Sequence, residues 1–273
     1  MFRRGLVDGE ALRKAMFGER YSSPHGTRGA PGGGEAVRVE NLVVLGDHGE
    51  LAVNNVSFSV GRGEVFAIAG VAGNGQRELV EALAGFRRAS RGRIVMLGRD
   101  VTHEPPFRRA LMGLALIPED PFRQGVAMDL SLAENIALKL ARRSIVSLDE
   151  AEELVEKAVK LLSIAAPSGR APVRTLSGGN VQKVVVAREL LSGPRVLVAY
   201  NPTRMLDEAS ASRVREMIGE LASRGTAVIL VSEDIEEAVG LGDRIAVMSR
   251  GRLSEAFPRS SVDVDALEKL MAE

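Results

Sequence analysis

Two stretches of this chain combine glycines with the expected start of a helix, a combination that binds anions. One of them reads Leu176-Ser177-Gly178-Gly179-Asn180-Val181-Gln182-Lys183, and a helix is predicted from Val181 to Leu191. Free backbone N–H groups and the positive end of the helix dipole lie at such a start, and glycines place no side chain before them. Thr175 and Ser177 are the predicted N-caps. These residues therefore predict a surface that contacts phosphate.

The second stretch is a glycine-rich turn between a predicted strand and a predicted helix. The apolar run Val65–Ala69 leads into Gly70-Val71-Ala72-Gly73-Asn74-Gly75-Gln76-Arg77, and Glu78–Ala84 is expected to be helical. The spacing is that of a phosphate loop, in which a Lys contacts the β- and γ-phosphates and a Ser or Thr hydroxyl binds Mg²⁺. Gln76 and Arg77 stand at those two positions. Losing a charged hydrogen bond of about 1.5 to 3 kcal/mol predicts roughly ten- to a hundredfold weaker nucleotide binding, and a turn that binds nothing is the alternative.

Residues 176–183 reproduce the signature sequence of ATP-binding-cassette (ABC) ATPases, and from about Val37 to Leu253 the chain resembles an ABC nucleotide-binding domain. The resemblance implies an α/β fold: a P-loop NTPase core with a parallel sheet, an antiparallel β subdomain and an inserted helical lobe. It implies that ATP binds between the phosphate loop of one domain and the signature of a second nucleotide-binding domain. The family's motifs map the nucleotide-contacting positions onto Gly70, Gly73, Asn74, Gly75, Gln76, Arg77, Glu78, Glu119, Ser177, Gly178, Gly179, Gln182 and Asp207.

The positions that hydrolyse ATP in this family carry other residues here. The family ends the strand after the signature helix with Asp-Glu-Pro-Thr, in which Asp organises Mg²⁺ and Glu acts on the attacking water. This chain has Tyr200 and Asn201 at those positions, and Glu233 where the family has its switch His. An amide cannot accept a proton as a general base does, and losing that base typically costs about 10² to 10⁴ in rate. No catalytic residue is assigned to this chain, and Mg²⁺ is expected mainly at the partner's site.

The segment around Glu119 narrows the resemblance to importers. Glu119 stands where the family has its Q-loop Gln, and Ile117-Pro118-Glu119-Asp120 with Ser131-Leu132-Ala133-Glu134-Asn135 is similar to the second half of fused sugar and nucleoside importer ATPases. The sequence Gly70–Gln76 resembles the nucleoside branch of these importers. In that branch the second half commonly lacks the catalytic residues and keeps an intact signature. The resemblance implies one hydrolytic site per pair, to which this chain contributes the signature and Asp207, with membrane-spanning permease subunits as further partners.

Two other functions stay open from the sequence. In one, the chain dimerises with itself and hydrolyses ATP with Glu119 or Glu233 as the base, which requires a Mg²⁺ site without a carboxylate at Tyr200. In the other, it is a binding module with the ABC fold outside transport, as in DNA repair or translation. A coiled-coil insertion or a strongly basic surface would favour that module, and the sequence has neither.

Composition excludes several kinds of site and partner. Lys plus Arg equal Asp plus Glu at 36 each, so no net charge favours nucleic acid. The chain has no Cys, and its three His show no metal-ligand spacing, so no metal site is predicted. It also has no apolar stretch of 18 residues and no signal peptide. We therefore expect no direct membrane insertion, and a cytoplasmic location on the inner membrane face through permease subunits.

The motifs lie between predicted strands and helices, which would hold them in position. Further strands are predicted at Val37–Leu45, Leu51–Val60, Val196–Tyr200, Ala227–Ser232 and Arg244–Ser249. The chain is predicted to be mainly helical from Ser131 to Leu191, with one helix at Leu148–Ser163. Two more helices are predicted at Ala209–Arg224 and Ile235–Leu241. This alternation predicts parallel pairing. The expected organisation is an N-terminal helix and Gly/Pro-rich linker (1–34), the nucleotide-binding domain (35–258, helical lobe about 122–191) and a C-terminal tail helix (259–273).

Overall fold

The structure is a computed structural model that describes residues 34–139 and 148–272. The helix and linker expected over 1–34 lie outside the described residues, apart from Gly34. Within the part that is described, no helix is long and apolar enough to cross a membrane.

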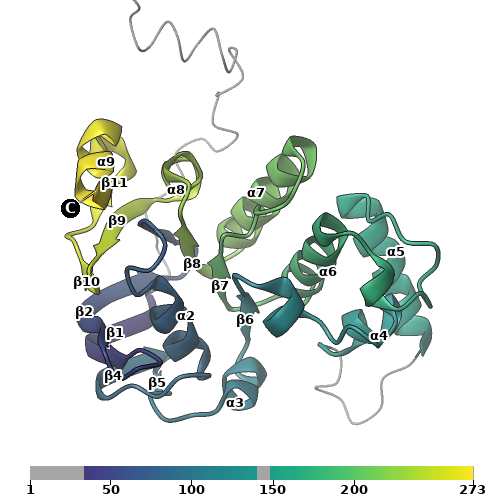
Figure 1. Cartoon of the computed structure of the whole chain (residues 1–273), viewed down its shortest axis with the longest axis horizontal. Helices are drawn as coiled ribbons and strands as arrows, with labels where there is room; N and C mark the ends of the chain where they lie inside the picture. Colours follow the sequence, from purple (N-terminus) through teal and green to yellow (C-terminus); the bar gives the residue numbers. More distant parts are fainter. Residues whose placement is uncertain (1–33, 140–147, 273) are drawn as a thin grey trace, which may run out of the picture.

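A mostly parallel sheet forms the centre of the molecule (Figure 1). Its five parallel strands lie in the order β9-β3-β8-β7-β6, and two short strands pair antiparallel with β9. The strands are β3 (Val65–Ala69), β6 (Leu114–Ile117), β7 (Val196–Tyr200), β8 (Ala227–Ser232), β9 (Arg244–Ser249), β10 (Arg252–Leu253) and β11 (Phe257–Pro258). The predictions for β3, β7, β8 and β9 are confirmed residue for residue. Strand β6 was not predicted from the sequence, since four apolar residues between irregular segments give little periodicity.

A second, antiparallel sheet packs on one side of the parallel one. Its strand order is β2-β1-β4-β5, with β1 (Glu35–Leu45), β2 (Leu51–Gly61), β4 (Arg91–Met96) and β5 (Arg99–Asp100). The tight turn between β1 and β2 closes through the Gly46 N–H, which donates to the Glu50 carbonyl at 2.8 Å. This sheet confirms the predicted antiparallel β subdomain, and its hairpin lies next to the glycine-rich loop.

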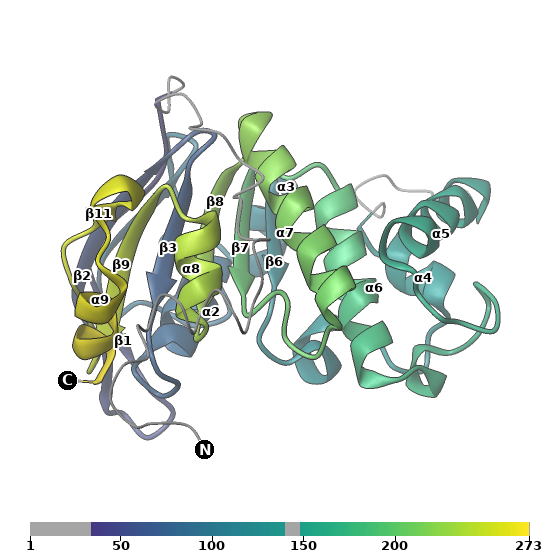
Figure 2. The ribbon, with the colours of Figure 1, turned by 90° about the horizontal axis from the view of Figure 1, so that it is seen from above.

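Helices cover the central sheet and form the lobe that Figures 1 and 2 show at the right. Those beside the sheets are α2 (Gln76–Ala84), α3 (Pro106–Leu111), α7 (Glu208–Ser223), α8 (Ile235–Leu241) and α9 (Val264–Ala272), which follows the 3₁₀ turn η5 (Arg259–Ser261). Those of the lobe are the π-helix η2 (Pro121–Gly125), α4 (Leu132–Ala137), α5 (Leu148–Leu162), the 3₁₀ turn η4 (Val173–Thr175) and α6 (Gly178–Leu191).

The structure corrects three of the sequence expectations. Residues 163–172 form no helix between α5 and η4. Helix α6 begins at Gly178, three residues before the predicted start, because glycines tolerate the first turn and the apolar pattern becomes visible only from Val181. Thr175 is not its N-cap: it lies in η4 and its hydroxyl donates to the Pro172 carbonyl at 2.7 Å.

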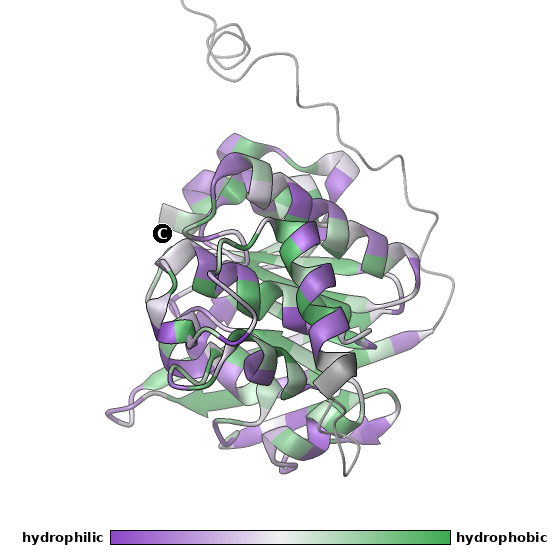
Figure 3. Ribbon diagram, turned by 90° about the vertical axis from the view of Figure 1, so that its right-hand side faces the viewer, coloured by the Kyte–Doolittle hydropathy of each residue, from purple (hydrophilic) through white to green (hydrophobic). Residues whose placement is uncertain are grey.

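Two hydrophobic clusters pack on opposite faces of the parallel sheet. Along β3, Ala67 belongs to the cluster shared with α5 to α8, whereas Phe66 and Ile68 belong to the cluster shared with β1, β2 and α2. Figure 3 shows hydrophobic residues concentrated on the central strands, while the helices alternate between hydrophobic and hydrophilic residues. With both faces covered, the carboxyl-end edge of the strands is the place where such a sheet binds ligands.

Candidate nucleotide site and signature surface

A pocket of about 570 Å³ opens at the carboxyl ends of the parallel strands. The glycine-rich loop follows β3, Glu119 follows β6 by two residues, and Tyr200 ends β7. The residues that line the pocket are Glu50, Leu51, Ala52, Ala72, Gly73, Asn74, Gly75, Arg77, Glu78, Glu119, Tyr200, Arg250 and Gly251. The tertiary structure thus brings together most of the residues predicted for this chain's own nucleotide site, and it places the signature residues elsewhere.

Gln76, at the position of the phosphate-loop Lys, is turned into the loop and does not line the pocket. It is buried, with 1% of its surface exposed. The amide oxygen accepts the Asn74 N–H at 3.0 Å, and the amide nitrogen donates to the Val71 carbonyl at 2.9 Å. The loop is therefore bridged by its own side chain.

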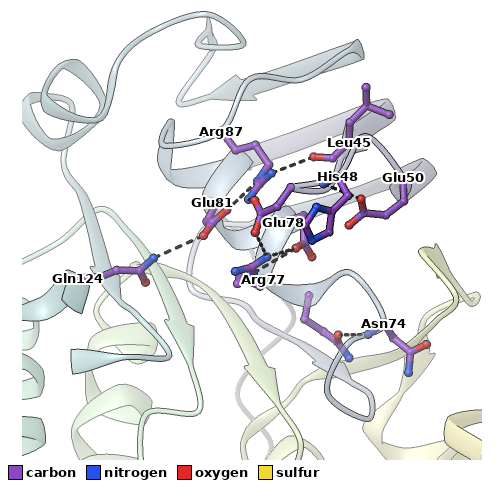
Figure 4. A network of polar contacts seen from close by, with 11 residues as sticks. Leu45, His48, Glu50, Asn74, Arg77, Glu78, Glu81, Arg87 and Gln124 are labelled. Carbon is purple, nitrogen blue, oxygen red and sulfur yellow. Dashed lines mark hydrogen bonds and ion pairs between the residues drawn. The ribbon is translucent and has the colours of Figure 1, made fainter. Parts of the chain in front are cut away.

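Arg77, at the position of the Mg²⁺-binding hydroxyl, is held by two carboxylates (Figure 4). Its guanidinium lies 2.7 Å from Asp47 Oδ2 and 2.9 Å from Glu78 Oε1. Asp47 also binds Arg87 at 2.6 Å, and these two guanidinium groups lower the pKa of Asp47 to about 2. The carboxylates in turn raise the pKa of Arg77. The positive charge of Arg77 is therefore balanced within the protein, and the ion pair between Asp47 and Arg77 joins the β1–β2 turn to α2.

Asn201, at the position of the family's catalytic Glu, and Glu233, at the position of its switch His, are linked to each other. Asn201 Nδ2 donates to Glu233 Oε1 at 3.1 Å, and the Glu233 N–H donates to Asn201 Oδ1 at 3.0 Å. Asn201 adopts a φ of 46°, a conformation that Asn tolerates better than most residues. Tyr200 is buried, and desolvation raises the pKa of its phenol, so it stays neutral. Neither Tyr200 nor Asn201 offers an anionic ligand or a strong base.

These residues do not fit a hydrolytic Mg²⁺–ATP centre. A hard cation such as Mg²⁺ takes oxygen ligands, preferably carboxylates together with the nucleotide's phosphates. Here the side chains at the two ligand positions are a guanidinium and a phenol, Arg77 and Tyr200. Glu119 lines the pocket, but Arg204 lies 3.3 Å from its carboxylate.

The buried carboxylate of Glu237 binds two hydroxyl groups near this site, and its burial predicts that the stability of the fold depends on pH. Its buried carboxylate accepts the hydroxyls of Thr203 at 2.6 Å and Ser232 at 2.7 Å, at the ends of β7 and β8. Desolvation by burial raises the pKa of Glu237 above 4.5 in the folded chain. A carboxyl with a raised folded pKa contributes stability that is complete below 4.5 and is lost as pH rises towards the folded pKa.

We therefore expect Glu237→Gln to gain stability relative to the wild type as pH rises above 4.5, by up to about 1.4 kcal/mol per pH unit within that window. Thermal unfolding of both proteins between pH 4.5 and 8 measures the difference. Glu236→Gln removes an exposed carboxylate from the neighbouring position and serves as the control. A difference between Glu237→Gln and the wild type that does not change with pH would contradict the raised pKa.

The signature forms a separate surface at the start of α6. Ser177 is exposed at the N-cap position, with no hydrogen bond from its side chain to the helix backbone. Its hydroxyl oxygen accepts the Asn180 side-chain amide at 2.8 Å, which leaves its proton free to donate outwards. The first intrahelical bond is donated by the Val181 N–H to the Ser177 carbonyl at 2.9 Å, so the amides of Gly178, Gly179 and Asn180 have no partner within the helix. This surface is suited to a phosphate brought by another domain.

A neighbouring element requires glycine at Gly179, whereas a side chain at Gly178 would make only ordinary van der Waals contacts. A Cβ added at Gly179 would lie 2.9 Å from the Met205 carbonyl oxygen, tighter than real contacts. A Cβ at Gly178 would meet Phe122 at 3.5 Å and the Met205 sulfur at 3.7 Å. Gln182 is 1% exposed and donates to the Pro202 carbonyl at 3.0 Å, so it holds the signature helix against the loop after β7.

Asp207 connects the same loop to α6 and α7. It caps α7 by accepting the Ser210 N–H at 2.9 Å, and Lys183 of the signature helix lies 3.2 Å from its carboxylate. The hydrogen bonds from Ser210 and the Lys183 cation lower the pKa of Asp207 to about 2. The signature helix and the loop that ends at Asp207 therefore act as one unit.

Among the residues at these sites that were not assigned from the sequence are Asp47, Arg250, Phe122 and Met205. The pairing of Asp47 with Arg77 depends on a hairpin 30 residues away. The backbone of Arg250 reaches the phosphate loop across 176 residues. Such contacts between distant segments have no signal in one sequence, and Phe122 and Met205 stand out only once their exposure is known.

Comparisons with known proteins show to which family this chain belongs. The family model for ABC transporters matches residues 53–204, more than half of the chain. The glucose import ATP-binding protein of Haloferax volcanii is 41% identical over 83% of this chain and 42% of its own length. The ribose import ATP-binding protein of Geobacillus kaustophilus is 34% identical over 92% of this chain and 50% of its own length. The guanosine import ATP-binding protein of Bacillus subtilis is 33% identical over 96% of this chain and 53% of its own length. The chain spans about half the length of these relatives.

Solved structures show the same fold. A dimeric bacterial ABC transporter cassette superposes with a TM-score of 0.74 at 21% identity, covering 82% of this chain and 98% of that one. The ATP-binding subunit of an ABC transporter gives the same TM-score of 0.74 at 21% identity, covering 87% of this chain and 100% of that one. These findings confirm the α/β P-loop NTPase fold predicted from the motifs. The chain belongs to the ABC transporter family, as an ATP-binding domain homologous to sugar and nucleoside import ATP-binding proteins.

Proposed function

We propose that this chain is the ATP-binding subunit, or half-subunit, of an ABC importer for a nucleoside or a simple sugar, and that its signature completes the hydrolytic site of a second nucleotide-binding domain. The observation that carries the proposal is the contrast between two surfaces. Ser177, Gly178 and Gly179 form an intact signature at the start of α6, whereas Tyr200 and Asn201 replace the metal ligand and the base of the chain's own site. An asymmetric pair with one hydrolytic site follows.

The relatives support the importer part of the proposal. Their names assign them to the import of ribose, glucose and guanosine, so the proposal includes both simple sugars and nucleosides. In such an importer the chain would contact permease subunits and lie on the cytoplasmic face of the membrane. ATP and Mg²⁺ would act mainly at the partner's site. We also propose 35–258 as the nucleotide-binding domain, with 122–191 as its helical lobe and 259–273 as a tail.

Steady-state hydrolysis of Mg-ATP tests this proposal. We expect no turnover by the chain alone and strong turnover when it is mixed with a second ABC domain that has the phosphate-loop Lys, the acidic pair and the switch His. Loss of a general base alone lowers rates by about 10² to 10⁴, so the contrast is large.

Two outcomes would overturn parts of the proposal. Turnover by the chain alone would mean that it is a self-sufficient ATPase, with Glu119 or Glu233 in a role that their ion pair and hydrogen bonds do not support. No change in the second domain's rate on mixing would mean that the signature does not complete its site.

A further inference from the structure

The phosphate loop of this chain already contains an acceptor for one of its own amides, that of Asn74. The Gln76 carboxamide lies inside the loop, with its oxygen 3.0 Å from the Asn74 nitrogen and its nitrogen 2.9 Å from the Val71 carbonyl oxygen. A Cβ added at Gly70 would lie 2.5 Å from the Gln76 amide nitrogen and 2.5 Å from the Met248 carbonyl oxygen. The side chain therefore fills the space that the glycine leaves.

Asn74 holds the loop in this form from the other side. Its side-chain nitrogen donates to the Val71 carbonyl at 3.0 Å, and its side-chain oxygen accepts the Arg250 N–H at 2.7 Å. The Gly251 N–H donates to the Asn74 carbonyl at 3.0 Å. The loop is thus fastened to the turn between β9 and β10 by contacts within the protein.

The charges around the loop do not favour a triphosphate either. A phosphate in such a loop is bound by backbone N–H groups and neighbouring cations. Here the Asn74 N–H is taken by Gln76, and the Arg77 guanidinium is bound to Asp47 and Glu78. The pocket wall carries three carboxylates and two guanidinium groups, from Glu50, Glu78, Glu119, Arg77 and Arg250. An entering polyphosphate has to displace an internal acceptor, and it finds the Arg77 guanidinium already paired with carboxylates.

We propose that Gln76 is an internal substitute for a nucleotide phosphate, so that this chain's own pocket gains no affinity from the phosphates of a nucleotide. Gln76 is then the specificity-determining residue of the pocket: adenosine, ADP and ATP bind it equally weakly. The inference rests on the proposed function only in taking this loop as the chain's own nucleotide site.

The affinities of the isolated chain for ATP and for adenosine, measured by calorimetry or equilibrium dialysis, test the inference. For the wild type we expect a ratio close to one. In Gln76→Ala the Asn74 N–H and the interior of the loop become free, so ATP is expected to bind at least about tenfold more tightly than adenosine. Gln76→Glu is the matched control, since it keeps the shape and the acceptor and adds a negative charge, and its ratio should stay at or below that of the wild type.

A second measurement does not depend on any variant. Hydrogen exchange of the Asn74 amide in the wild-type chain is expected to be unchanged by inorganic tripolyphosphate, because Gln76 already protects that amide. Slower exchange with tripolyphosphate, a wild-type preference of about tenfold or more for ATP over adenosine, or a folded Gln76→Ala without increased preference would each overturn the inference. All of these use the chain alone, so they are independent of the hydrolysis assay with the second domain.

Discussion

Ser177→Arg is expected to abolish ATP hydrolysis by the pair formed with a catalytic ABC domain, lowering its rate at least about a hundredfold. Ser177 is exposed at the start of α6, and its hydroxyl has a free proton because the oxygen accepts from Asn180. An arginine there replaces the short hydroxyl and places a long side chain in front of the amides of Gly178 and Gly179, in the space where the partner's phosphate would lie. Donors aimed at developing phosphate charge are worth about 10² to 10³ each in rate.

Steady-state hydrolysis by the mixture measures this effect, and Asn201→Gly is the matched control. Asn201 lies at the base position of the chain's own site, and glycine adopts its φ of 46° without strain. The control should leave the rate of the pair close to that of the wild type. Retained activity in Ser177→Arg would contradict the shared site, and lost activity in a folded Asn201→Gly would mean that this chain's own site hydrolyses ATP.

Arg109→Met is expected to destabilise the fold by about 3 kcal/mol. Arg109 is 1% exposed, and its guanidinium donates to the carbonyls of Ala82, Leu83, Thr102 and Glu104 at 2.6 to 3.2 Å. Two of these carbonyls end α2, where a cation also interacts favourably with the helix dipole. Methionine fills the apolar space but removes these donors. The Ala82 carbonyl keeps the Gly85 N–H at 3.2 Å, whereas a buried carbonyl left without a donor costs about 1 to 3 kcal/mol.

The net effect is smaller than the sum over four acceptors. Burial lowers the pKa of Arg109 to about 10, which shows that the charge is desolvated, and removing it relieves that penalty. We expect the midpoint of thermal unfolding to fall by about 6 to 12 °C, at about 2 to 4 °C per kcal/mol for a domain of this size. Arg108→Met, at the exposed neighbouring position, should change it little. Equal midpoints for the two variants would show that Arg109 does not hold the end of α2.

Much of the fold was predictable because its signals are local. Strands β3, β7, β8 and β9 are short apolar runs, buried on both faces, and each is bounded by glycines or polar residues. The alternation of these strands with α7 and α8 predicted parallel pairing, which the structure confirms. Strands β4 and β6 escaped prediction. In β4, three exposed residues precede three buried ones, so neither a helical nor an alternating period extends over the strand.

The residue types at the candidate sites were also determined by the sequence. Gln76, Arg77, Tyr200, Asn201 and Glu233 were identified by their spacing within motifs, and spacing is a property of the chain alone. A guanidinium, a phenol and an amide cannot bind Mg²⁺ or accept a proton as carboxylates do, whatever the fold around them. The amino-acid sequence alone is therefore enough to identify the family and to propose the loss of hydrolytic chemistry.

Only the tertiary structure decided which hydrogen-bond and ion-pair partners those residues have. Asp47 binds Arg77 across 30 residues, Asn201 and Glu233 meet across 32, and Arg250 reaches Asn74 across 176. Such pairings depend on which strand ends meet at one edge, and hydrogen bonds and ion pairs act only over a few ångströms. The sequence determined that the phosphate loop has lost its lysine, whereas the fold decided that Gln76 takes the place of a ligand.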